Sequence, residues 1–109
     1  HRSLRKGLAF TISPAWALER LETQQGLCFY SDLPMQVAAG VGRGKGDRDS
    51  SLSYDRVRND QGYTLENTVL AVLRINHMKS NASLEEMRAW MPGWHARAMR
   101  FLEAHGNAD

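Results

Sequence analysis

Hydrophobic and polar positions divide the chain into short segments of different period. In FTISPAWALERLETQQG, residues 9–12 are β-like and a helix is expected after them. Ser13 is a favourable N-cap residue, Pro14 fits the first turn of a helix, and Gly26 is expected to end it. The following segment, LCFYSDLPMQVA, predicts a strand, a tight turn and a second strand, with Pro34 at a sheet edge.

The middle of the chain contains a segment of unusual composition, followed by segments with strand-like and helix-like hydrophobic patterns. Residues 41–51 are rich in glycine and charge and contain no large core residue, so we expect a flexible loop there. Residues 52–57 alternate in polarity and predict a short strand. NDQGY predicts a turn, and the apolar positions of LENTVLAVLRINHMKS predict a core helix over residues 65–80.

Two further helices are predicted near the C-terminal end. Ser83 and Glu86 have the spacing of a capping box, Pro92 separates the two helices, and Gly106 is expected to end the second. The mixture of short strands and helices predicts an α+β fold. We expect a single domain over residues 1–109, because the length suits one domain and the sequence contains no internal repeat.

Composition and charge narrow the class of protein. The chain has no run of about eighteen apolar residues, so no membrane span and no membrane partner are predicted. Cys28 is the single cysteine, which excludes an internal disulfide and a thiolate zinc knuckle and favours a small buried residue. The net charge is only +2, but the basic residues occur in clusters. Such clusters suit a polyanion, although solvated loops also carry them for solubility alone.

Several short motifs in SYDRVRNDQGYTLENTVLAVLRINHMK resemble the core of the HNH nucleases, also called His-Me finger or ββα-metal enzymes, and especially their phage-encoded members. Upstream, QQGLCFYSDLPM is similar to the first hairpin of that family. The resemblance runs roughly from Phe10 to Trp90 and rests on the order and spacing of the motifs together. The matching residues are Asp55-Arg56-Val57, Gly62-Tyr63, Asn67, Asn76 and Lys79.

The resemblance implies a small ββα-metal core with an N-terminal helix and C-terminal helices, and a metal-dependent endonuclease that hydrolyses DNA phosphodiester bonds. Asp55 and Asn76 would hold one divalent cation, Mg²⁺ or Mn²⁺, and Asn67 would order the loop. Asp55, Arg56 and Asn67 are the expected catalytic residues. The expected DNA contacts are Arg43, Lys45, Arg48, Arg56, Arg58, Arg74 and Lys79.

The chain departs from the family pattern at two places. Many members hold a structural zinc with four cysteines, and no structural zinc is expected here. The four corresponding positions are Cys28, Ser31, Val72 and Ile75.

The second departure concerns the general base. Arg56 stands where the family has its catalytic histidine, and arginine is a poor base. Three explanations stay open: a metal-bound water needs no protein base, His77 or Tyr54 replaces it, or the protein binds without cutting. The register is also open by one residue, in which case Asp55 is itself the base.

Each expected site residue also has an ordinary structural explanation. Asp55 could pair with a neighbouring arginine, Asn67 is a good helix N-cap, and Asn76 could bond a loop backbone. Lys79 and Arg74 would complement a helix dipole in any case. On the level of function, the alternatives are a catalytically inactive nucleic-acid-binding or structural module on the same fold, and an interaction domain unrelated to nucleic acid. Many such nucleases act as homodimers, but no heptad pattern marks an interface. The sequence leaves the cellular address open, and phage or bacterial cytoplasm agrees with the resemblance.

Overall fold

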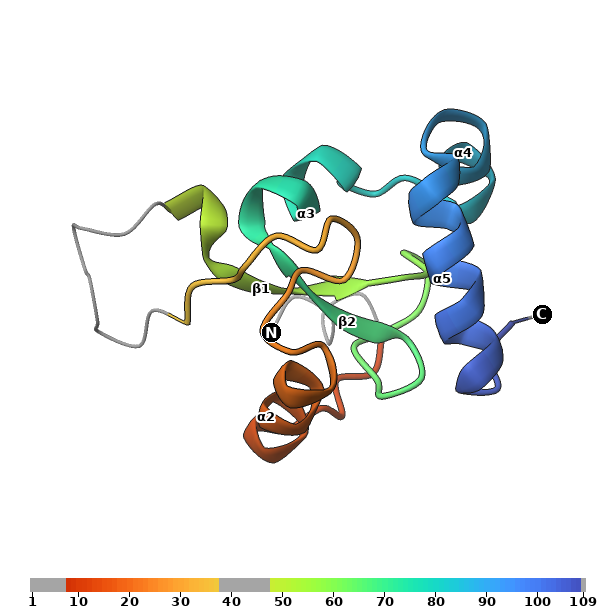
Figure 1. The fold of residues 1–109 in the computed structure, drawn as a ribbon. Coiled ribbons are helices and arrows are strands. Elements are labelled where there is room, and N and C mark those ends of the chain that lie inside the picture. The colour runs from red at the N-terminus through yellow and green to blue at the C-terminus, as the bar shows by residue number, and fades with distance from the viewer. Residues whose placement is uncertain (1–7, 38–47, 109) are drawn as a thin grey trace.

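A computed structural model of the protein describes residues 8–37 and 48–108, which form a small mixed α/β domain (Figure 1). Its helices and strands are, in chain order, α2 (Pro14–Thr23), the 3-10 turn η1 (Arg48–Ser50), β1 (Leu52–Arg56), β2 (Thr68–Val72), α3 (Leu73–Lys79), α4 (Leu84–Trp90) and α5 (Pro92–Ala104). This arrangement confirms a mixed fold of helices and short strands.

The centre of the fold is an antiparallel pair of strands, β1 and β2. Leu52 pairs with Val72 at one end of the register, and Arg56 pairs with Thr68 at the other. In Figure 1, α3 lies above the strand pair and α2 below it, while α5 runs past the end at which β1 finishes. All five residues of β2 are buried, as expected for a strand that is covered on both faces.

The prediction of one helix over residues 65–80 is wrong in its first half, because residues 68–72 form β2 and only Leu73–Lys79 are helical. A short run of consecutive apolar residues does not distinguish a strand buried on both faces from a buried helix. Met78, within that predicted core helix, is 58% exposed. Asn67 is not a helix N-cap, since it lies in the turn immediately before a strand.

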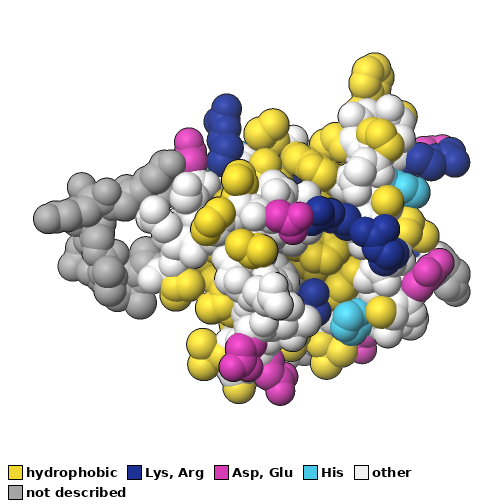
Figure 2. All heavy atoms as spheres, viewed as in Figure 1, with side chains coloured by type: hydrophobic (Ala, Val, Ile, Leu, Met, Phe, Trp, Pro, Cys, Tyr) yellow, Lys and Arg dark blue, Asp and Glu magenta, His cyan; other side chains and the backbone are white. Residues whose placement is uncertain are grey.

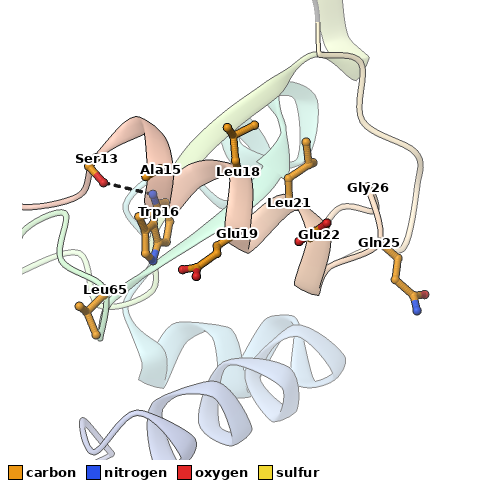
Figure 3. A pocket seen from close by; sticks show the side chains of 10 residues that line it. All are labelled: Ser13, Ala15, Trp16, Leu18, Glu19, Leu21, Glu22, Gln25, Gly26 and Leu65. Atoms are coloured by element: carbon orange, nitrogen blue, oxygen red, sulfur yellow. Dashed lines mark hydrogen bonds between the residues drawn. The ribbon is translucent and has the colours of Figure 1, made fainter.

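The local signals for the other helices are confirmed. Ser13 precedes α2, and its Oγ accepts a hydrogen bond from the Trp16 backbone N–H (Figure 3). Ser83 and Glu86 form a complete capping box at the start of α4. Gly106 follows α5 with a φ of 72°, in the left-handed region that favours glycine.

The predicted first hairpin is present as a turn with little regular strand. A single antiparallel bridge joins Leu27 to Pro34, and Asp32 adopts a φ of 62° between them. Of the loop expected over residues 41–51, the described part begins at residue 48, and Arg48–Ser50 form η1 instead of irregular chain. The rest of that loop, with Arg43 and Lys45, lies outside the described residues.

One hydrophobic core lies between the strands, the hairpin turn and α5. Cys28 and Tyr30 of the hairpin meet β2, and α5 contributes its buried face. The buried members of α5 are Ala98, Phe101 and Leu102. None of the helices in the described ranges is long and apolar enough to cross a membrane.

Gly62 allows two distant segments to approach each other, and this close approach generates a prediction. A Cβ at Gly62 would lie 2.1 Å from the backbone O of Ala9, whereas a Cβ at Gly93 in α5 would have no atom within 4 Å. The backbone N–H of Tyr63 donates to that same oxygen at 2.9 Å. Gly62→Ala should therefore lower the free energy of unfolding by about 1–3 kcal/mol, as overpacking does.

The measurement is urea denaturation of the two variants beside the wild type. Gly93→Ala is the matched control, and it should leave stability unchanged or slightly raised because alanine favours helices. Equal stability of Gly62→Ala and Gly93→Ala would contradict the close approach.

Candidate functional site

The centre of the candidate site is Asp55, a carboxylate that is only 3% exposed. It lies near the end of β1, between the hairpin turn and α3. The Tyr30 hydroxyl donates to its Oδ2 at 2.6 Å, and the Nζ of Lys79 lies 3.3 Å from its Oδ1. Lys79 also donates to the backbone O of Arg56 at 2.9 Å. The ordinary alternative for Asp55, an ion pair, is therefore present, with a lysine in place of an arginine.

Burial and charge act on Asp55 in opposite directions. Burial raises the pKa of Asp55, while the positive charge of Lys79 and the hydrogen bond from Tyr30 act to lower it, and the net direction is upward. Burial and the adjacent Asp55 carboxylate raise the pKa of the Tyr30 hydroxyl well above its usual value. Tyr30 therefore remains a hydrogen-bond donor at neutral pH.

Asn76 lies in α3, half-buried, over the same face of the strand as Asp55. Its Nδ2 donates to the Oγ of Ser53 at 3.0 Å and to the backbone O of Tyr54 at 2.8 Å. Because Ser53 and Asp55 are two positions apart in β1, their side chains share one face. The structure thus brings the amide and the carboxylate to the same side of the strand. The bond to Tyr54 also matches the backbone contact given above as the alternative role of Asn76.

Asn67 orders the loop that joins the two strands. Its Oδ1 accepts from the backbone N–H of Arg58 at 2.8 Å. Its Nδ2 donates to the backbone O atoms of Arg58 and Gly62, each at 3.0 Å. The side chain is fully buried, so these hydrogen bonds replace hydrogen bonds to water. They hold the loop over residues 58–62 against β2.

The two arginines that follow Asp55 are held against the protein. The Arg56 guanidinium lies 5.3 Å from the centroid of the Tyr63 ring and donates to the Gln61 backbone O at 3.4 Å. The Nε of Arg58 donates to the backbone O of Asn107 at 3.1 Å. Both side chains are half-buried at the end of the strand pair.

The remaining expected residues are dispersed. Arg48 in η1 and Arg74 in α3 are exposed, on different elements. Lys79 is 2% exposed, so its ammonium faces Asp55 and not the surface where a phosphate contact would lie. Of the two candidate bases, His77 is exposed, and Tyr54 packs its ring edge-on against Trp16 with centroids 6.2 Å apart.

The fit of these residues to a divalent cation is mixed. Asp55 and Asn76 carry the oxygen ligands that Mg²⁺ prefers, and they lie on one side of β1. Both oxygens of Asp55 are, however, already bonded, one to Tyr30 and one to Lys79. Within residues 8–37 and 48–108, no three His, Cys, Asp or Glu side chains form a group that could hold a metal ion. Cys28 and Val72 are buried in the core.

Sequence reasoning missed two polar residues of this region. Tyr30 was not expected to bond Asp55, although its place two residues after the buried Cys28 puts it on the inward side of the hairpin. Gln24, just after α2, accepts from the Leu70 backbone N–H and donates to the Leu70 backbone O, at 3.0 and 2.9 Å. Only the tertiary structure shows either contact, because each joins segments far apart in the sequence.

A broad apolar hollow lies elsewhere, along α2. Figure 3 shows Leu18 and Leu21 on this helix with Glu19 and Glu22 beside them and Leu65 at one end. None of the expected site residues lines it.

No protein-family model matches the chain, and a search of the curated proteins finds no match.

The Lys79–Asp55 pair leads to a prediction about stability and pH. Lys79→Met keeps the length of the side chain but leaves the buried carboxylate without its cation, which typically costs about 3–5 kcal/mol. Without Lys79 the pKa of Asp55 should rise further above 3.8. Between the pKa of Asp55 in the unfolded state and its higher pKa in the folded state, the folded state binds more protons. The free energy of unfolding therefore decreases as pH rises through this range.

Urea denaturation at about pH 4 and at about pH 7 measures this effect, and the loss caused by Lys79→Met should be larger at the higher pH. Arg88→Met, which removes an exposed cation from α4, is the matched control and should have a small effect at both pH values. A loss that is small, or independent of pH, would show that the pair is not formed.

A further prediction concerns the loop that Asn67 holds. Asn67→Ala removes three hydrogen bonds and takes away the side chain that pairs with the Arg58 backbone N–H and the Gly62 backbone O, at a cost of about 2–4 kcal/mol. The exposed Asn81, changed to Ala, is the control and should cost little. Amide hydrogen exchange should show faster exchange at Arg58 in Asn67→Ala only. Unchanged protection at Arg58 would be evidence against this role.

Proposed function

We propose that the protein is a metal-dependent DNA endonuclease of HNH type that hydrolyses phosphodiester bonds. The observation that supports this proposal best is the common orientation of Asp55 and Asn76, which strand β1 and helix α3 bring to the same face. The order hairpin, loop, strand and helix also agrees with the motifs that resemble the family. DNA is the proposed partner, and a homodimer stays a prediction.

The proposed roles follow from the contacts of each side chain. Asn67 keeps the loop over residues 58–62 in place, so that the end of β1 has one defined conformation. Arg56, stacked on Tyr63 at the start of this loop, would contact a phosphate without changing its protonation. The exposed Arg48 and Arg74 would add contacts to the DNA backbone.

Asp55 and Asn76 would hold one Mg²⁺ or Mn²⁺ ion, and when bound this ion supplies Lewis-acid activation of a phosphodiester. Lys79 must first give up the Asp55 oxygen that it now contacts. The Lys79 ammonium would then be available to a phosphate group, the role that the motif implies.

A second candidate function is a nucleic-acid-binding module on the same fold without catalysis. The Lys79–Asp55 pair favours it, because the ammonium already provides the positive charge beside the carboxylate. Arg56 at the position of the usual histidine favours it as well, since a guanidinium does not accept a proton in proteins.

A plasmid assay distinguishes the two functions. Supercoiled DNA is incubated with the protein and Mg²⁺ or Mn²⁺, with EDTA as the metal-free control. Asp55→Asn and Asn76→Ala should each reduce nicking at least about tenfold, because a catalytic ion contributes several kcal/mol to the transition state. Arg88→Gln on α4 should nick like the wild type. Circular dichroism checks that each variant is folded.

The outcomes separate the proposals. Nicking that needs the metal ion and is lost in both variants supports the endonuclease. Salt-dependent DNA binding without nicking supports the binding module and overturns catalysis. Absence of nicking together with absence of binding at about 50 mM salt, where phosphate contacts are strong, overturns both.

A further inference from the structure

A second cluster of cationic side chains lies away from Asp55, in a hollow between α2 and α5. We name it the arginine hollow. Figure 2 shows dark blue side chains and a cyan histidine together on the face in front of α5. Its polar and charged lining consists of Arg20, Asp32, Arg97, Arg100 and His105.

Among the described residues, Asp32 is the single carboxylate that lines the arginine hollow, and Arg97 already neutralises it. Nη1 and Nη2 of Arg97 donate to Oδ1 and Oδ2 of Asp32, at 2.9 and 2.7 Å. This bidentate contact lowers the pKa of Asp32. The pair leaves the positive charges of Arg20 and Arg100 uncompensated within the hollow.

Arg20 is the most informative of these residues, because it is half-buried and forms no ion pair with any acidic residue that the structure describes. Its Nε donates to Gln24 at 3.0 Å, and its guanidinium lies 5.0 Å from the centroid of the Phe101 ring. Burial lowers its pKa, so removing this cation from water carries a cost. Glu19 and Glu22 lie beside Arg20 in an adjoining hollow. The ion pairs of the described chain, however, involve only Lys79 with Asp55 and Arg97 with Asp32.

The geometry of the arginine hollow is that of an anion site. Arg20 is fixed by Gln24 and by the Phe101 ring, so its terminal nitrogens are oriented before any ligand arrives. Arg100 approaches from α5 and is exposed. The His105 ring stacks on Phe101 with centroids 4.2 Å apart and closes one wall. A guanidinium group can bind two oxygens of one phosphate through two parallel hydrogen bonds. These bonds are stronger where water is partly excluded.

We propose that the arginine hollow binds a phosphate group, with Arg20 and Arg100 as its ligands. The site is independent of Asp55 and of any catalysis there. A phosphodiester of a nucleic acid and inorganic phosphate share this chemistry, and the experiment distinguishes the two sources.

The experiment is an NMR titration of the ¹⁵N-labelled 109-residue chain at constant ionic strength. One arm adds inorganic phosphate and the other adds a 12-base-pair DNA duplex. The side-chain Nε–Hε signals of Arg20 and Arg100 should shift in at least one arm and not with added chloride. Arg20→Gln and Arg100→Gln should each weaken that binding about tenfold or more, the usual worth of a hydrogen bond to a charged group. Arg88→Gln, an exposed arginine on α4 and outside the hollow, should weaken it less than about twofold.

The two arms identify the source of the phosphate. Shifts with the duplex indicate a nucleic-acid backbone. When the duplex titration is repeated at several salt concentrations, the slope of log K against log salt concentration should then be smaller by about one in Arg100→Gln. Shifts with inorganic phosphate alone indicate a small phosphate ligand. Arg20→Gln also loses the contact with Phe101, so Arg100→Gln, at an exposed position, decides the result if the first variant is unstable. The proposal is overturned if neither probe shifts these signals, or if Arg88→Gln weakens binding as much as Arg100→Gln.

Discussion

The buried carboxylate of Asp55 is the constraint on which the centre of this fold depends. A charged group removed from water is stable only where other groups replace the lost hydration, and here Tyr30 and Lys79 do so. Tyr30 belongs to the hairpin turn, Asp55 to β1 and Lys79 to the last turn of α3. One side chain therefore joins three elements that hydrophobic contact alone would hold less specifically. The direction of α3 across the strand follows from this, since Asn76 bonds at Ser53 and Tyr54 and Lys79 bonds at Asp55 and Arg56.

Asp55 has both a structural role and an expected chemical role. Asp55 is the expected metal ligand, and it is also the anion that makes a buried Lys79 tolerable. The two roles exclude each other at Oδ1, which cannot contact the ammonium and an ion in the same geometry. In the proposed endonuclease, cation binding at this position would therefore be an exchange of one positive charge for another. Asn67 is free of this conflict, because its bonds are all to the backbone of the loop that it closes.

Charge elsewhere on the molecule is less evenly compensated than the net value of +2 implies. Arg97 and Asp32 neutralise each other where α5 meets the hairpin turn, while Arg20 stays half-buried, hydrogen-bonded to the Gln24 amide and placed over the Phe101 ring. The two basic regions, at the end of β1 and in the arginine hollow, arise from different parts of the chain. A polyanion that reached both would be oriented on the domain by its backbone and not by its bases.

The local features of this protein were determined by its sequence, because they depend on residues a few positions apart. Ser13 with Pro14, the Ser83–Glu86 capping box and Gly106 mark helix ends correctly, and the alternation over residues 52–57 marks β1. The motif residues Asp55, Asn67 and Asn76 could also be singled out, although not their partners. The tertiary structure alone decided that residues 68–72 are a strand, since burial on both faces removes the alternation that would have revealed it. It alone decided that Lys79 points inward to Asp55, that Tyr30 completes this cluster and that Arg20 and Arg100 line one hollow, because each of these arrangements joins segments that only folding brings together.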